Sequence, residues 1–357
     1  MRTALYEAHT ELGAKIVDFA GWDMPIQYKN LKNEVLQVRD NVGVFDVSHM
    51  GEFFISGTDT IRFLDELVTN DVKNAELLKA IYSPLCREDG TIIDDLIVYK
   101  LTQTEVMICV NAANIEKDLS WISSKAHGYN VKIEDKSKLY SLIAVQGPKT
   151  FEVLSTIELG SKLEDIPYYS IQTTDLSQDV PVLFARTGYT GEDGFEIFGS
   201  HEYIKNIWNQ LINKGVEPCG LGARDVLRLE VCYPLYGHEL NDEVTPLDSG
   251  LRWTVKLNKD HFFGKEALVA YEPKSRLIKF TIDKGVPRAG YKIVNSKKES
   301  IGFVTSGTMS PCLGLGIAIA RIDKDQYNPK ETYSIEIRNK IVPINIVKKS
   351  FVTGGHK

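Results

Sequence analysis

The sequence predicts an α+β fold followed by a small β-domain. Through residues 1 to about 260, helical and strand-like segments are interleaved without the regular strand–helix–strand rhythm of a doubly wound sheet. From residue 277 onward, short β-type runs are separated by Gly, Pro, Asn and Lys-Lys turns. The chain has 357 residues, of which 25% are charged and 43% hydrophobic. Such a composition is typical of a globular protein, and the length allows two or three domains.

Helices are predicted where apolar side chains recur at helical spacing. Asn111 opens one of these segments, and Ser200 is placed to cap another that ends just before Gly215. Pro234 follows the last segment and ends it. The expected helices span residues 31–40, 60–68, 111–128, 201–214 and 220–230.

Strand-like runs lie between these helices and fill the C-terminal part. The runs of the first part span 51–57, 90–100, 105–111, 140–147 and 180–188. The C-terminal runs span 279–283, 291–295, 300–307, 314–322, 332–338 and 342–349. Their number and spacing predict a separate β-barrel or sandwich. The polar stretch 271–276 is the expected boundary, which gives one domain over residues 1–260 and a barrel domain over residues 277–351.

Charge and targeting signals exclude several classes of protein. The 48 acidic residues outnumber the 42 basic ones, so no general attraction to nucleic acid or to an anionic membrane is expected. No stretch approaches the ~20 apolar residues that span a bilayer, and the N-terminal residues lack the apolar region of a secretory signal. The five cysteines are scattered, which is typical of reduced thiols. These features predict a cytoplasmic protein that binds neither nucleic acid nor membrane.

The first candidate for chemistry is the pair Asp94 and Asp95 in the strand-like run 90–100. Successive side chains of a strand point to opposite faces, so the two carboxyl groups do not form a dyad on one face. The alternation places Ile92 with Asp94 and Ile93 with Asp95, so both faces look apolar. A carboxylate held there needs hydrogen bonds or a cation, or its pKa rises. A structural Asp and a tuned carboxylate facing a ligand are both open at this point.

The second candidate is Glu196 in the stretch 186–196, whose three glycines are spaced three residues apart. A phosphate-binding loop is not predicted, because the Gly-Lys-Ser/Thr ending is missing and no helical pattern follows. The flanking runs are strand-like, which makes Glu192–Gly194 a hairpin turn. Glu196 then lies in a strand, either as a surface-facing edge residue or as a carboxylate that binds a ligand.

The third candidate is Arg224 in the stretch 220–230. Arg224 and Arg228 lie four residues apart on the predicted helix. Arg228 could form surface ion pairs with Asp225 or Glu230, which would contribute little to stability. Arg224 could instead present its planar guanidinium to a carboxylate or to the carbonyl group of a heterocycle; spacing alone leaves both open.

Several common catalytic signatures are missing from the sequence. No HExxH pair, no GxSxG elbow, no strand-linked GxGxxG and no cysteine-based metal knot occurs. Asp46, Ser48 and His49 are close in sequence, but closeness in sequence is not triad geometry. Neither metal nor nicotinamide chemistry nor a covalent serine mechanism is therefore predicted.

Together these stretches resemble the T-protein family of the glycine cleavage system, the aminomethyltransferases. The resemblance rests on long motifs in matching order, and it runs from near the N-terminus to residues 348–351. The motifs span residues 18–25, 42–52, 90–98, 110–114, 186–196, 220–230 and 305–311.

The resemblance implies a three-lobed arrangement, in which two interleaved α+β lobes and a C-terminal β-barrel surround a central folate channel. It also implies a reaction. Tetrahydrofolate, as co-substrate, takes the methylene group from the aminomethylated dihydrolipoyl arm of the H-protein. Ammonia leaves, and 5,10-methylenetetrahydrofolate and dihydrolipoyl H-protein remain; no metal is required.

The resemblance further implies roles for individual residues. Asp95 matches the family's key carboxylate, which orients the folate and assists proton movement. Glu196 and Arg224 match the residues that bind the pterin, since a carboxylate can accept from its N–H groups and a guanidinium can donate to its carbonyl. Further candidates for lining the folate channel are Met50, Tyr82, Asn111, Tyr189, Tyr233 and Trp253.

The sequence leaves two alternatives to this function open. One is a tetrahydrofolate-dependent demethylase, which would share the folate pocket and differ on the donor side. The other is a non-enzymatic folate-binding protein of the type that maintains iron–sulfur clusters. Such proteins carry a Lys-Gly-Cys-Tyr-type motif, whereas here Cys232-Tyr233 is followed by Pro-Leu-Tyr. The aminomethyltransferase is therefore the favoured expectation.

Overall fold

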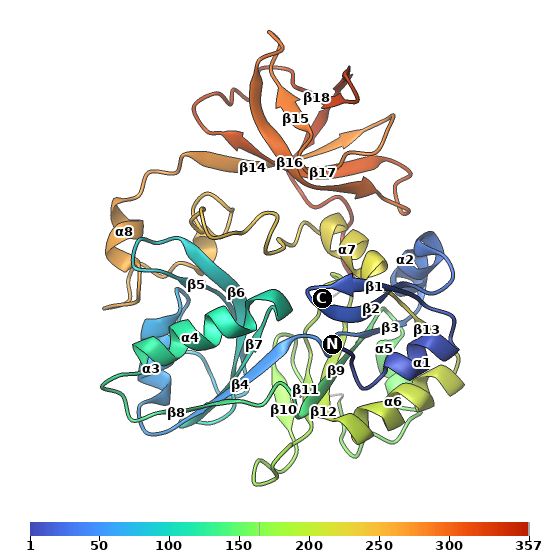
Figure 1. Cartoon of the computed structure of the whole chain (residues 1–357), viewed down its shortest axis with the longest axis vertical. Coiled ribbons are helices and arrows are strands. Elements are labelled where there is room, and N and C mark those ends of the chain that lie inside the picture. Colours follow the sequence, from blue (N-terminus) through green and yellow to red (C-terminus); the bar gives the residue numbers. More distant parts are fainter. Residues whose placement is uncertain (164, 356–357) are drawn as a thin grey trace.

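The computed structural model describes residues 1–163 and 165–355. Three lobes are arranged around a common centre, two of mixed helices and strands and one of strands alone (Figure 1). The α+β class and the three-lobed arrangement predicted above are confirmed.

The first lobe is built on a six-stranded sheet with the strand order β10-β11-β12-β9-β3-β13. Its strands and the hairpin beside it are β1 (Lys15–Phe19), β2 (Trp22–Gln27), β3 (Gly43–Asp46), β9 (Tyr140–Gln146), β10 (Ile171–Thr173), β11 (Leu183–Ala185), β12 (Gly194–Ser200) and β13 (Glu217–Pro218). Its helices are α1 (Tyr6–Glu11), α2 (Leu31–Asp40), α5 (Thr150–Leu154), α6 (His201–Asn213) and α7 (Leu221–Glu230). The middle strands are buried on both faces, so Ile143 packs toward α6 while Leu142 packs toward the second lobe.

The second lobe is inserted into the first, between β3 and β9. It is a five-stranded sheet with the order β5-β6-β7-β4-β8. Its elements are β4 (Gly51–Ser56), α3 (Thr60–Leu67), β5 (Ala80–Cys86), β6 (Ile92–Lys100), β7 (Glu105–Val110), η1 (Ala112–Asn114), α4 (Ile115–Lys125) and β8 (Lys132–Asp135). Helices α3 and α4 cover its outer face (Figure 1). Because the chain leaves the first sheet and returns to it, the two lobes are interleaved as predicted.

The C-terminal lobe is a curled sheet of seven strands with the order β19-β18-β15-β16-β17-β14-β20. The strands are β14 (Ser275–Ile282), β15 (Lys292–Val294), β16 (Ser300–Met309), β17 (Gly316–Asp323), β18 (Ser334–Ile337), β19 (Lys340–Pro343) and β20 (Asn345–Val347). Strands β19 and β20 form the two opposite edges, yet a single residue, Ile344, separates them in the chain. The sheet must therefore curl so that its edges come close at Ile344, and this makes it the half-barrel that the sequence predicts as a barrel.

Two details of the strands differ from the sequence-based expectation. A bulge in the β5–β6 pairing, between Leu85 and Cys86, breaks the alternation at the start of β6. As a result Ile93 packs with Leu96 and Val98, not on the face of Asp95. Strand β14 begins at Ser275, inside the stretch expected to be a linker, because Ser275 pairs with Asp323 of β17.

The predicted run 342–349 is also not one strand. Pro343 ends β19 because proline has no N–H to donate. The chain then passes to the other edge of the sheet, where β20 pairs with β14. The hairpin turn expected at Glu192–Gly194 is likewise part of a longer connection, since β11 ends at Ala185 and β12 begins at Gly194.

A long segment and the C-terminal tail tie the lobes together. Residues 231–274, with η2 (Arg252–Thr254) and α8 (Lys265–Ala270), connect α7 to the half-barrel past the second lobe (Figure 1). The tail returns to the centre of the molecule, where the Val352 N–H donates to the Glu230 carbonyl over 2.9 Å.

Arg228 joins α7 to these connecting elements, and the alternative of surface ion pairs is wrong for it. The residue is only 1% exposed. Its guanidinium lies 2.9 Å from the buried carboxylate of Glu239, donates to Ser306 of β16 over 2.8 Å, and also pairs with Asp225. Glu230 pairs with Arg39 of α2 instead. Arg228 is placed inside the molecule because the half-barrel covers this face of α7.

Candidate functional site

A cavity of about 920 Å³ lies where the three lobes meet. The first lobe lines it with residues of the β1–β2 hairpin, β12 and α7, and the second lobe lines it with residues of β5, β6 and the segment after β7. The half-barrel contributes Leu277, Lys279 and Ile319. All nine residues predicted for the site lie along this cavity: Met50, Tyr82, Asp95, Asn111, Tyr189, Glu196, Arg224, Tyr233 and Trp253.

Asp95 faces the cavity from β6 and is held by two neighbours. Its Oδ2 accepts from the Tyr82 hydroxyl over 3.0 Å, and its Oδ1 accepts from the Asn111 side-chain amide over 2.9 Å. The ring of Tyr82 stacks on Trp253 with a centroid distance of 6.0 Å. Burial and the neighbouring charge of Asp94 raise the pKa of Asp95 to about 7. Near neutral pH this carboxyl group can therefore hold a proton or release it.

Glu196 reaches the cavity from β12 and is 8% exposed. One carboxylate oxygen, Oε2, accepts from the Thr187 hydroxyl over 2.5 Å. Among the described residues no donor reaches the other oxygen, Oε1. Of the two readings left open for Glu196, the surface-facing edge residue is wrong, because β12 lies inside the sheet between β11 and β9.

Arg224 lies in the first turns of α7, which packs tightly on the β1–β2 hairpin. A side chain at Gly220 would come within 2.3 Å of the Ile26 backbone, so glycine is needed for this close approach. The Arg224 guanidinium lies 4.8 Å from the centre of the Tyr189 ring. Its Nη1 is buried, and within the described part of the chain it has no hydrogen-bond acceptor. A buried donor without an acceptor costs free energy, which points to an acceptor supplied by a ligand.

His49 lines the same cavity and was not among the predicted site residues. Burial lowers the pKa of His49 to about 4, and its Nδ1 has no partner among the described residues. The neighbouring Asp46 carboxylate is occupied by Thr3, His9 and the Ser48 backbone N–H, so no Ser-His-Asp triad forms. His49 is therefore a neutral polar group available to a ligand.

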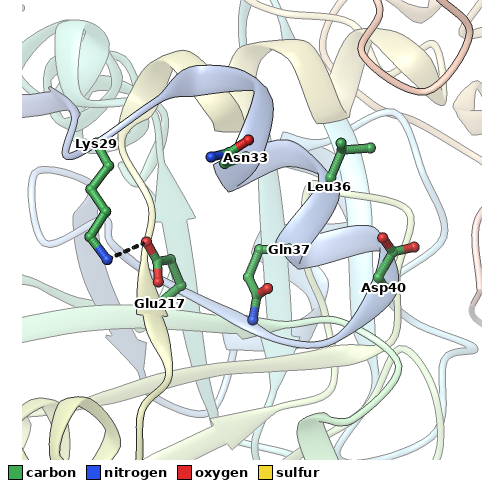
Figure 2. A pocket seen from close by; sticks show the side chains of 6 residues that line it. All are labelled: Lys29, Asn33, Leu36, Gln37, Asp40 and Glu217. Atoms are coloured by element: carbon green, nitrogen blue, oxygen red, sulfur yellow. Dashed lines mark ion pairs between the residues drawn. The ribbon is translucent and has the colours of Figure 1, made fainter.

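A second, smaller hollow lies on the outside of the first lobe. It is lined by Lys29, Asn33, Leu36, Gln37, Asp40 and Glu217 (Figure 2). Its one lysine is paired with Glu217, with the two charged atoms 3.2 Å apart. None of the predicted site residues borders this hollow, so the candidate site is the central cavity.

Two other kinds of site are absent from residues 1–163 and 165–355. No group of three or more His, Cys, Asp or Glu side chains there is arranged to hold a metal ion. None of the helices in that part is both long enough and apolar enough to cross a membrane.

Comparison with known proteins accounts for nearly the whole chain. Residues 5–259 match the family model described as the GCVT N-terminal domain, and residues 275–353 match the glycine cleavage T-protein C-terminal barrel domain. The aminomethyltransferase of Thermosipho melanesiensis is 49% identical over 99% of this chain and 98% of its own length. That of Thermotoga maritima is 44% identical with the same coverage.

A solved structure agrees with these relatives. The glycine cleavage system aminomethyltransferase T from Bartonella henselae superimposes with a TM-score of 0.93 at 29% identity, over 100% of this chain and 99% of that one. The chain therefore belongs to the glycine cleavage T-protein family, as an enzyme that transfers a one-carbon unit in the glycine cleavage system.

Proposed function

We propose that the chain transfers the methylene carbon of an S-aminomethyldihydrolipoyl group, carried by the H-protein, to tetrahydrofolate. The carbon exchanges its bonds to sulfur and to the amine for bonds to two folate nitrogens. The folate nitrogens lose two protons, and the products are 5,10-methylenetetrahydrofolate, ammonia and the dihydrolipoyl thiol. The observation that carries the proposal is a cavity at the junction of the three lobes, with a carboxyl group of pKa about 7, a buried carboxylate and a guanidinium nitrogen without an acceptor among the described residues along its wall.

Glu196 and Arg224 are proposed to bind the pterin. The Oε1 of Glu196, which no donor of the described residues reaches, suits the amino and ring N–H groups. The Nη1 of Arg224, which has no acceptor among those residues, suits the ring carbonyl. Tyr189 and Tyr233, whose rings lie 5.9 Å apart, would form an aromatic wall beside Arg224. Met50, Tyr82, Asn111 and Trp253 are proposed to line the rest of the folate channel.

Asp95 is proposed to orient the folate and to take up a proton during transfer. The reacting carbon must meet folate while water is kept out, because water would hydrolyse the aminomethyl group. A cavity between three lobes, entered by the lipoyl arm, would serve this purpose.

The pH dependence of turnover follows from this role. Only the ionised Asp95 can accept a proton from a folate nitrogen, so the rate of ammonia release is expected to rise with pH through about 7. The measurement is the single-turnover rate over about two pH units on either side of that value. A rate that does not change with pH across this range would show that Asp95 does not take up a proton during transfer.

Arg224→Ala is expected to weaken tetrahydrofolate binding by about 1.5–3 kcal/mol, the contribution of a hydrogen bond to a charged group. Titration calorimetry of wild type and variant gives this difference directly. Arg252→Ala is the matched control, because Arg252 is exposed and does not line the cavity. Equal folate affinity of wild type and Arg224→Ala would contradict the pterin assignment.

The folate product tests the function itself. With a ¹³C-labelled aminomethyl group on the H-protein, the label is expected in 5,10-methylenetetrahydrofolate. The full-length relatives favour this outcome over the demethylase and over the non-enzymatic folate-binding protein. Label transfer from a small methylated amine, with none from the H-protein, would establish the demethylase instead.

A further inference from the structure

A buried row of polar side chains begins at Asp95 and extends away from the cavity. Asp94, the neighbour of Asp95 on β6, and Asp118, in the first turn of α4, are both 0% exposed. Asn111 connects the row to the site, since its side-chain amide donates to the Asp94 carboxylate over 2.8 Å and to the Asp95 carboxylate over 2.9 Å.

The hydrogen bonds within this row determine where a proton must lie. Asp94 accepts from the Asn111 backbone N–H, from the Asn111 amide and from the Asn114 amide, over 3.1, 2.8 and 2.6 Å. Neither carboxyl oxygen of Asp118 accepts from any N–H or O–H of the described residues. Asp118 and Asp94 are nevertheless neighbours whose carboxyl groups interact. Two carboxyl groups can share a hydrogen bond only if one is protonated, and the one without donors is Asp118.

We propose that Asp118 is a positioning residue that stays protonated at neutral pH and donates its hydrogen bond to Asp94. The inference rests on the proposed role of Asp95, because it concerns how that carboxyl group is held. Asp94 thereby accepts from Asp118 in addition to the Asn111 backbone N–H and the Asn111 and Asn114 amides. It accepts one N–H of the Asn111 amide and so holds the other toward Asp95, which leaves the Asp95 Oδ2 to Tyr82 and the cavity.

The charged groups around Asp118 agree with this assignment. Asp94 of β6 is its nearest charged group, the Asp95 charge also acts on it, and Lys117 lies next to it on α4. The Lys117 Nζ donates to the Tyr236 hydroxyl over 2.7 Å. Burial, then the negative charge of Asp94, raise the pKa of Asp118 to about 11. The Lys117 charge opposes this shift without cancelling it.

Asp118→Asn and Asp118→Val separate the hydrogen bond from simple packing. Asparagine keeps a donor toward Asp94, so its pH profile and turnover are expected to match wild type within about threefold. Valine has a similar volume but cannot donate a hydrogen bond. Without that bond Asp94 takes up a proton more readily, and a neutral Asp94 repels the charge of Asp95 less. In Asp118→Val the rise in turnover is expected about one pH unit lower, with turnover reduced about tenfold or more. Folate affinity should stay unchanged in both variants.

Glu116→Gln is the control on the same helix, because Glu116 is exposed and should change nothing. If asparagine and valine have the same pH profile, the donated hydrogen bond does not position Asp95 and the inference is overturned. Thermal unfolding of both variants identifies a folding defect, and ¹³C-carboxyl NMR of the wild-type protein then supplies a second test. An Asp118 resonance typical of an ionised carboxylate at pH 7.5 would also overturn the proposal. This NMR result does not depend on turnover, so it is distinct from a failure of the proposed function.

Discussion

Asp95→Asn is expected to bind tetrahydrofolate with nearly wild-type affinity and to lose most turnover. The amide has the shape of the carboxyl group and can keep the contacts with Tyr82 and Asn111, but it cannot accept and hold a proton. The loss of a positioned proton acceptor reduces rates by about 10²–10⁴-fold. The experiment combines folate titration with the rate of ammonia release from aminomethylated H-protein.

Stability distinguishes this functional loss from a damaged fold. The pKa of Asp95 is raised in the folded state, from an ordinary value near 4 to about 7. Its contribution to folding stability is therefore present at acid pH and is lost as the pH rises through 7. Asparagine has no such loss, so Asp95→Asn should unfold at the same temperature as wild type at pH 8, or higher. Unchanged turnover in this variant would remove Asp95 from the mechanism.

Arg228→Ala is expected to destabilise the protein by about 3–5 kcal/mol, because it leaves the buried Glu239 carboxylate without its cation. The same change removes the contact with Ser306, so α7 loses a connection to the half-barrel. Chemical unfolding measures the difference. Arg62→Ala is the control, since the Arg62–Asp59 pair is exposed and should contribute at most about 1 kcal/mol.

A second substitution tests the cause of the Arg228 effect. In Arg228→Ala combined with Glu239→Gln no buried charge is left unpaired, so part of the lost stability should return. Equal destabilisation by the single and the double variant would show that Arg228 acts through packing and not through its charge.

The sequence predicts those parts of the fold that depend on local patterns. Ser200 caps α6 as expected, its hydroxyl accepting from the Tyr203 N–H over 3.3 Å, and the helices at 31–40 and 220–230 lie within a residue of their predicted bounds. The pairing of distant strands could not be predicted from these local patterns. Two features depend on how strands pair with one another. One is the bulge that turns Ile93 to the other face of its strand, and the other is the passage of the chain at Ile344 from one edge of the half-barrel to the other.

The residues of the candidate site were likewise predictable from the sequence only in part. Motif resemblance brought out Asp95, Glu196 and Arg224, which the fold gathers along one cavity from three separate elements. Asp118 was not among the predicted site residues, although the sequence contains a pattern that indicates it. It lies three residues after Ile115 and four before Ile122, so it occupies the apolar face of its helix. A carboxyl group on such a face must be protonated or paired, and only the structure identifies Asp94 as its partner.

The most direct test of the proposed reaction is the release of ammonia from aminomethylated H-protein, measured with and without tetrahydrofolate. Strong stimulation by the folate, together with its loss in Asp95→Asn, is the predicted result. If the protein binds tetrahydrofolate but releases no ammonia, the folate pocket stands and the proposed aminomethyl donor is wrong.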